Sequence, residues 1–198
     1  MLIVGLNGSS NTNGNTKFLI NKVLEEAKIL GAEIKIIEIG EIMEYLDKAF
    51  CNACTNPCSG ICYKDTSLTE VFELMERADA LVLGSPSYFG TVSGQMKAFF
   101  DKTRALRSRK ALYNKVGVGV TVGASKYGGQ ETTLKALHDI MLVHGMILIG
   151  DGFRDDDCGH HGVCAQRPSD KDEFAIKRAQ ITGRRIYEVA QATMGLRV

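Results

Sequence analysis

The chain has 198 residues, of which 44% are hydrophobic and 24% charged, and its formal net charge is +1. This balance is typical of a globular protein and gives no reason to expect nucleic acid or an anionic membrane as a partner, because no long basic face is present. No apolar run comes near the ~18 residues that a spanning helix needs, and the start "MLIVGLNGSS" does not resemble a signal peptide. We therefore expect a single domain, residues 1–198, in the cytoplasm.

Short apolar runs alternate with helical patterns along the chain, which predicts strand–helix–strand units and a parallel sheet. The first helix is expected over residues 15–30, and a Ser67–Glu70 capping box predicts the start of the second. Later helices are expected around Phe99, Leu137 and Ile186. Strands are expected at residues 1–6, 32–39, 78–86, 115–123 and 146–150. Together these elements predict an α/β fold, a doubly wound five-stranded sheet with helices on both faces.

Three polar, glycine-rich segments follow the first, third and fourth predicted strands: "GSSNTNGNT", "SPSYFGTVSG" and "GASKYGGQET". In doubly wound sheets, ligands bind beyond the carboxyl ends of the strands. The sequence therefore predicts one ligand site built from these three loops.

The first loop combines short hydroxyl and amide side chains with the expected start of a helix. Free backbone N–H groups at such a start suit a phosphate monoester. No Lys follows a glycine as a P-loop requires, and a dinucleotide fingerprint with Glu38 as its ribose acid has a misplaced third glycine. An ordinary loop of turn-forming residues is the alternative. The polar residues are Ser9, Ser10, Asn11, Thr12, Asn13, Asn15 and Thr16.

The second and third loops favour a flat ring beside that phosphate. Tyr88 and Phe89 stand at a strand end, where paired exposed aromatic residues are unusual, and backbone N–H groups near Ser87 and Gly90 are placed to meet a ring edge. Glycines in the third loop allow a close approach of the backbone. A ring plus a monophosphate is what FMN presents.

Four cysteines, Cys51, Cys54, Cys58 and Cys62, lie within "CNACTNPCSGIC". They belong to a segment, residues 40–66, that is too long for an idle loop. Cytosolic thiols stay reduced, so the cluster favours an iron-sulfur centre, with zinc or unbound thiols as alternatives. A Cys51–Cys54 redox pair lacks the usual strand-to-helix context.

A second cysteine-containing stretch, "DDDCGHHGVC", follows the fifth predicted strand. Its thiols and imidazoles suggest either a metal site or a polar lid over the ligand site. The residues concerned are Cys158, His160, His161 and Cys164.

The motifs "SPSYFGTVSGQMKAFFD", "GGQETTLKAL" and "HGMILIG" resemble the flavodoxin-like NAD(P)H:quinone oxidoreductases of the tryptophan-repressor-binding-protein type. The loop "GSSNTNGNT" followed by a compact cysteine cluster is similar to the iron-sulfur flavoproteins, which are relatives of the NADPH-dependent FMN reductases. The resemblance covers residues 1–150. It implies a flavodoxin-like sheet in the order 2-1-3-4-5.

The resemblance also implies residues that contact the cofactor. It places the FMN phosphate on Ser9, Ser10, Asn11, Asn13, Gly14, Asn15 and Thr16. It places the ring against Pro86, Ser87, Tyr88, Phe89, Gly90, Gly123, Ala124, Gly128 and Gly129. His144 matches a histidine near the flavin in the quinone reductases, and the alternative is a helix-end histidine bound to a backbone carbonyl.

In the iron-sulfur flavoproteins such a cysteine cluster holds a 4Fe–4S centre, although here one extra residue precedes Cys58 and the last gap is shorter. The resemblance implies an FMN-dependent oxidoreductase that takes electrons from NAD(P)H or a ferredoxin-type donor and passes them to a quinone, a flavin or a protein. It also implies a homodimer or homotetramer. Two alternatives remain: a NAD(P)H-dependent FMN or quinone reductase without a cluster, and a redox- or iron-sensing flavin-binding module that is not an enzyme.

Overall fold

The computed structural model describes residues 1–197. Its central sheet has the order β2-β1-β3-β4-β5, which confirms the predicted order. Every residue of β3 and β4 is buried, as expected for parallel strands covered by helices on both faces. These strands are β1 (Leu2–Asn7), β2 (Glu33–Glu38), β3 (Ala80–Pro86), β4 (Val116–Gly123) and β5 (Ile147–Leu148).

The edge of the sheet beside β4 differs from the prediction. The strand expected at residues 146–150 is only two residues long, because β5 pairs with β4 only over the first two residues of β4. The chain then forms a small antiparallel pair, β6 (Asp151–Gly152) with β7 (Cys158–His160), and returns as β8 (Val163–Gln166). β8 pairs in parallel with the second half of β4. Two short segments therefore share the edge where one strand was expected.

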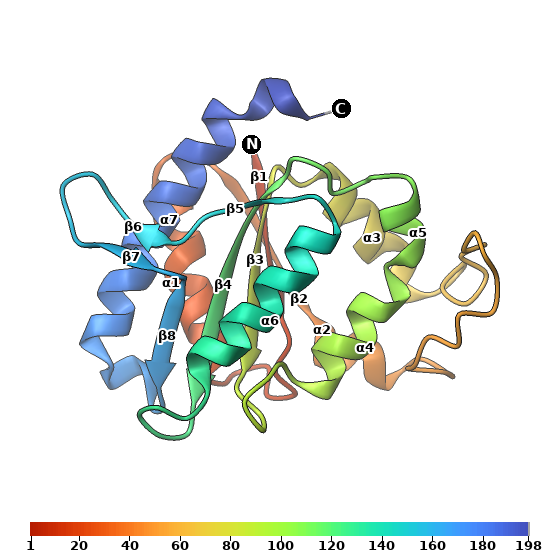
Figure 1. Cartoon of the computed structure of the whole chain (residues 1–198), viewed down its shortest axis with the longest axis horizontal. Helices are drawn as coiled ribbons and strands as arrows, with labels where there is room; N and C mark the ends of the chain where they lie inside the picture. Colours follow the sequence, from red (N-terminus) through yellow and green to blue (C-terminus); the bar gives the residue numbers. More distant parts are fainter. Residues whose placement is uncertain (198) are drawn as a thin grey trace.

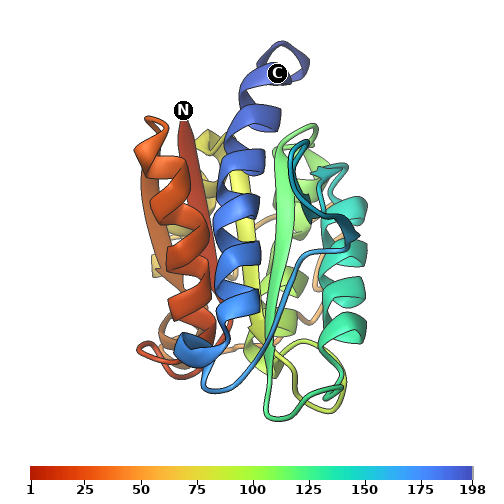
Figure 2. The ribbon, with the colours of Figure 1, turned by 90° about the vertical axis from the view of Figure 1, so that its left-hand side faces the viewer.

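Helices cover both faces of the sheet (Figure 1). α1 (Asn15–Ile29) and α7 (Glu173–Ala192) lie side by side on one face, as Figure 2 shows from that side. α3 (Ser67–Arg77), α4 (Gly94–Lys102) and α6 (Gln130–Val143) cover the other. This division follows from the amphipathic patterns, which give each helix one apolar stripe to bury.

The remaining elements are short. They are α2 (Ile39–Glu44), α5 (Arg104–Ser108) and the 3₁₀ helices η1 (Ser169–Lys171) and η2 (Met194–Leu196). Since α2 takes up the start of the expected cysteine-rich segment, the stretch without helix or strand runs from residue 45 to 66. No helix in the part of the chain that the structure describes is long and apolar enough to cross a membrane.

The start of α3 corrects the predicted capping box. Ser67 is the first helical residue, and Thr66 is the N-cap: its Oγ1 accepts a hydrogen bond from the Leu68 backbone N–H. The Thr66 hydroxyl also donates to the Tyr63 carbonyl, which fixes the cap one residue before the expected one.

Candidate functional site

The structure brings the three predicted loops together at the carboxyl edge of the sheet, the lower edge in Figure 1. The Ser93 hydroxyl, 0% exposed, donates to the Gly8 carbonyl at 2.5 Å and joins the β3–α4 loop to the β1–α1 loop. The Ser87 hydroxyl donates to the Gly128 carbonyl at 3.0 Å and joins the β3–α4 loop to the β4–α6 loop. Sequence reasoning missed Ser93, although its place before α4 is a typical N-cap signal.

The β1–α1 loop is shaped by a ladder of side-chain oxygens that accept backbone N–H groups two residues further along. Asn7 Oδ1 accepts from Ser9, Ser9 Oγ accepts from Asn11, and Asn11 Oδ1 accepts from Asn13, at 3.2, 3.1 and 3.0 Å. These oxygens hold the loop in its bend. The Ser9 hydroxyl and the Asn11 amide donors remain for a ligand.

The N-terminus of α1 is open. The N–H groups of the first turn of any α-helix have no acceptor within the helix. The N-cap here is Gly14, which has no side chain that could accept from them. The one cation in that turn, Lys17, pairs with Glu38 at 2.7 Å, while Asn7 Nδ2 donates to the other Glu38 oxygen at 2.6 Å. An anion at this terminus would therefore be held mainly by backbone N–H groups and the helix dipole. This arrangement fits the phosphate of FMN.

Predicted phosphate ligands differ in their surroundings. Thr16, at 2% exposure, is buried, whereas Ser10, Asn11 and Asn13 are exposed. Asn15 is partly exposed, and its side-chain oxygen accepts from the Ser169 backbone N–H at 2.7 Å. No sequence signal connected these two residues.

The β3–α4 loop turns tightly between Tyr88 and Thr91, whose backbones exchange hydrogen bonds of 3.0 and 3.1 Å. Phe89 and Gly90 occupy the two central positions with φ of 51° and 74°, as in a type I′ turn. The turn directs Phe89 fully into solvent and leaves Tyr88 half exposed. The Ser87 N–H, which we expected to meet a ring edge, donates instead to the Val122 carbonyl.

Gly129 permits the contact between the second and third loops. Its φ is +85°, and a Cβ there would lie 2.7 Å from Gly90 Cα. Gly123 is buried at the end of β4, where a Cβ would meet the Gln130 side chain, and Ala124 and Tyr127 are exposed on the loop itself. A cavity of about 890 Å³ opens beside this loop, between Tyr127 and Phe174.

The four predicted metal-binding cysteines are free thiols on the 45–66 segment. Cys54 and Cys62 are exposed, and Cys51 and Cys58 are partly buried. Within residues 1–197, no group of three or more His, Cys, Asp or Glu side chains is gathered so as to hold a metal ion. The chemistry of the donor set suits a soft metal or an iron-sulfur centre, but the thiols are not assembled around one point.

His144 is not brought together with the three loops. It caps the C-terminal end of α6, a helix whose N-terminal end adjoins the third loop, ~20 Å away along the helix axis. Its Nε2 lies 2.9 Å from Thr103 Oγ1, and burial, with a smaller contribution from Arg107, lowers its pKa to about 4. His144 and Cys51 line a common cavity of about 310 Å³.

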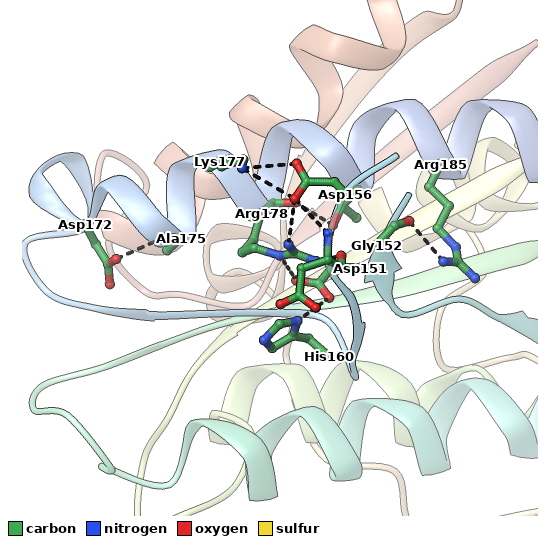
Figure 3. A network of polar contacts seen from close by, with 11 residues as sticks. Asp151, Gly152, Asp156, His160, Asp172, Ala175, Lys177, Arg178 and Arg185 are labelled. Carbon is green, nitrogen blue, oxygen red and sulfur yellow. Dashed lines mark hydrogen bonds and ion pairs between the residues drawn. The ribbon is translucent and has the colours of Figure 1, made fainter. Parts of the chain in front are cut away.

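The second cysteine-containing stretch is attached to α7 (Figure 3). Arg178 and Asp151, both almost fully buried, form an ion pair of 2.6 Å, and His160 Nδ1 lies 3.3 Å from the other Asp151 oxygen. Burial, followed by Glu131 and Asp151, raises the pKa of the Cys164 thiol to about 12. The Arg178 guanidinium also donates to the Asp157 carbonyl at 2.8 Å, and these contacts favour a structural role for the stretch.

Comparison with solved structures gives the same fold. A WrbA-like flavodoxin from Agrobacterium tumefaciens has a TM-score of 0.68 and 22% identity, over 97% of this chain and 98% of that one. RosB, solved with 8-demethyl-8-formylriboflavin-5′-phosphate, has a TM-score of 0.76 and 14% identity, over 100% and 82%. These neighbours and the strand order show that the chain has a flavodoxin-like fold.

The chain belongs to the NADPH-dependent FMN reductase family, whose model matches residues 1–157. An iron-sulfur flavoprotein of Methanocaldococcus jannaschii is 36% identical over 195 residues, covering 96% of this chain and 98% of that protein. An iron-sulfur flavoprotein of Methanosarcina thermophila is 34% identical, covering 96% of each. These findings confirm the resemblance to the iron-sulfur flavoproteins and to the NADPH-dependent FMN reductases.

Proposed function

We propose that this chain is an FMN-dependent oxidoreductase of the iron-sulfur flavoprotein type. The observation that carries the proposal is the open N-terminus of α1, where Gly14 leaves the first-turn N–H groups free beside two further loops of the same edge. Those N–H groups, with Ser9, Asn15 and Thr16, would hold the phosphate. The backbone of residues 86–90 and 123–129 would line the ring. FMN supplies the exchange of one or two electrons with its partners.

We further propose that Cys51, Cys54, Cys58 and Cys62 hold a 4Fe–4S cluster. Relatives named as iron-sulfur flavoproteins over nearly the whole chain support this, as do four free thiols on one segment. Because that segment contains no helix or strand, its backbone has few internal constraints that would prevent the thiols from converging on a metal. Zinc remains the alternative metal.

The chain's own residues then have a positioning function rather than a covalent one. They orient the ring at the carboxyl edge of the sheet, leaving its exposed side open to a small molecule or a protein. We expect NAD(P)H or a ferredoxin-type donor, a quinone or flavin acceptor, and a homodimer or homotetramer in the cytoplasm. A flavin-binding sensor module is the non-enzymatic alternative, and rapid turnover with a quinone would exclude it.

Protein purified without oxygen should show flavin absorption bands, a broad shoulder near ~400 nm and about four irons with matching acid-labile sulfide per chain. Reductive titration should consume about three electrons per chain, two for FMN and one for the cluster. About two electrons without iron would indicate a cluster-free FMN reductase. The absence of any flavin after incubation with FMN would contradict the proposal as a whole.

A further inference from the structure

Ser169 is 154 residues from Asn15 in the sequence and yet contacts it three times. The Ser169 backbone N–H donates to Asn15 Oδ1 at 2.7 Å, and the Ser169 hydroxyl lies 3.1 Å from both Asn15 Oδ1 and the Asn15 carbonyl oxygen. Ser169 is only 1% exposed. A buried residue of the β8–α7 connection is therefore bound to the first residue of α1.

These contacts determine which way the Asn15 amide faces. Since Oδ1 accepts from the Ser169 backbone N–H, a flipped amide would place its NH₂ group against that N–H and lose this bond. The amide nitrogen is thereby turned away from Ser169, and Nδ2 has no acceptor among residues 1–197. It remains available as a donor at the open terminus of α1.

The position of Ser169 is itself fixed. The Arg167 N–H donates to the Gly123 carbonyl at 3.0 Å, which joins the connection to the end of β4. The Asp172 carboxylate accepts from the Gln166 and Ala175 N–H groups at 2.9 and 3.0 Å, and so closes the turn on both sides of Ser169. A donor held this firmly can orient a side chain that belongs to another helix.

We infer that Ser169 is a positioning residue for the phosphate of FMN, and that its hydroxyl acts through the Asn15 amide. This inference rests on the proposed FMN function and extends the site beyond residues 1–157, where the family match ends. It predicts that Ser169 affects binding of the phosphate and not of the ring. Riboflavin, which has the ring but no phosphate, therefore serves as the internal reference.

The test is a double-mutant cycle with Ser169→Ala and Asn15→Ala, in which FMN and riboflavin dissociation constants are measured on flavin-free protein. We expect Ser169→Ala to weaken FMN binding roughly fivefold to tenfold, with riboflavin binding unchanged, and to have no further effect when Asn15 is already Ala. Thr182→Val is the matched control, because it also removes a buried hydroxyl, here one on α7 that donates to the Arg178 carbonyl. It should change thermal stability and leave the FMN-to-riboflavin ratio intact.

The possible failures are distinguishable. If Asn15→Ala weakens FMN selectively but Ser169→Ala does not, or if the two effects add, the Ser169 hydroxyl does not act through Asn15, and the proposed function stands. If neither variant changes the FMN-to-riboflavin ratio, the phosphate is not at Asn15, and the proposed site is overturned together with the inference. Equal losses for both flavins in Ser169→Ala, matched by Thr182→Val, would assign Ser169 a purely structural role.

Discussion

Replacing Gly14 with Asp should weaken FMN binding by roughly 100-fold or more and leave riboflavin binding nearly unchanged. Gly14 is the N-cap of α1, and its backbone (φ −92°, ψ −175°) is one that Asp adopts readily. The new carboxylate would occupy the free first-turn N–H groups and repel a phosphate by several kcal/mol. Binding of both flavins to flavin-free protein, followed by flavin fluorescence, measures the effect.

The same substitution should not destabilise the flavin-free protein, because an acidic N-cap interacts favourably with the helix dipole. The added Cβ would lie 3.1 Å from the Asn11 side chain, and this exposed side chain would need to shift by only a few tenths of an ångström. Gly14→Ser is the matched control: it caps the helix without a charge and should weaken FMN binding much less. Unchanged FMN affinity in Gly14→Asp would show that the phosphate binds elsewhere.

The double variant Cys54→Ser, Cys58→Ser should lose all cluster iron and sulfide when purified without oxygen, and should keep FMN. Serine oxygen is a poor ligand for an iron-sulfur centre, and two of the four proposed ligands are removed. FMN should remain, because neither residue belongs to the three loops at the carboxyl edge. Iron, sulfide and flavin assays on one sample measure all three outcomes.

Cys158→Ser is the matched control, since Cys158 is also an exposed free thiol but lies outside the 45–66 segment. It should retain a full complement of iron. If the Cys158 variant loses iron as completely as the double variant, the proposed ligand set is wrong. If the unaltered protein contains zinc in place of iron, the four cysteines bind zinc and not a 4Fe–4S cluster.

The strands of the sheet and the polar loops at its carboxyl edge were predictable because they depend on local signals. Runs such as Leu81–Leu83 and Val116–Val118 are buried on both faces, and glycine and polar residues directly follow the strands. The rule that parallel strands place their carboxyl ends at one edge then predicts a site. The strand order and the gathering of the three loops are confirmed.

The features of the fold that the sequence did not predict depend on contacts between distant residues or on short segments. β8 has four residues, too few for a periodic pattern, and its pairing with β4 follows an excursion through β6 and β7. The bond between Asn15 and Ser169 joins residues without any shared motif. Thr66 became the N-cap of α3 because its hydroxyl also reaches the Tyr63 carbonyl, which a capping-box pattern does not include.

The measurement that tests the central claim most directly is the ratio of the riboflavin and FMN dissociation constants for the unaltered protein. If the open terminus of α1 holds the phosphate, several charge-assisted hydrogen bonds are lost with riboflavin, and FMN should bind at least ~100-fold more tightly. Equal affinity for the two flavins would contradict the account, because the phosphate would then contribute nothing at the site where the loops converge.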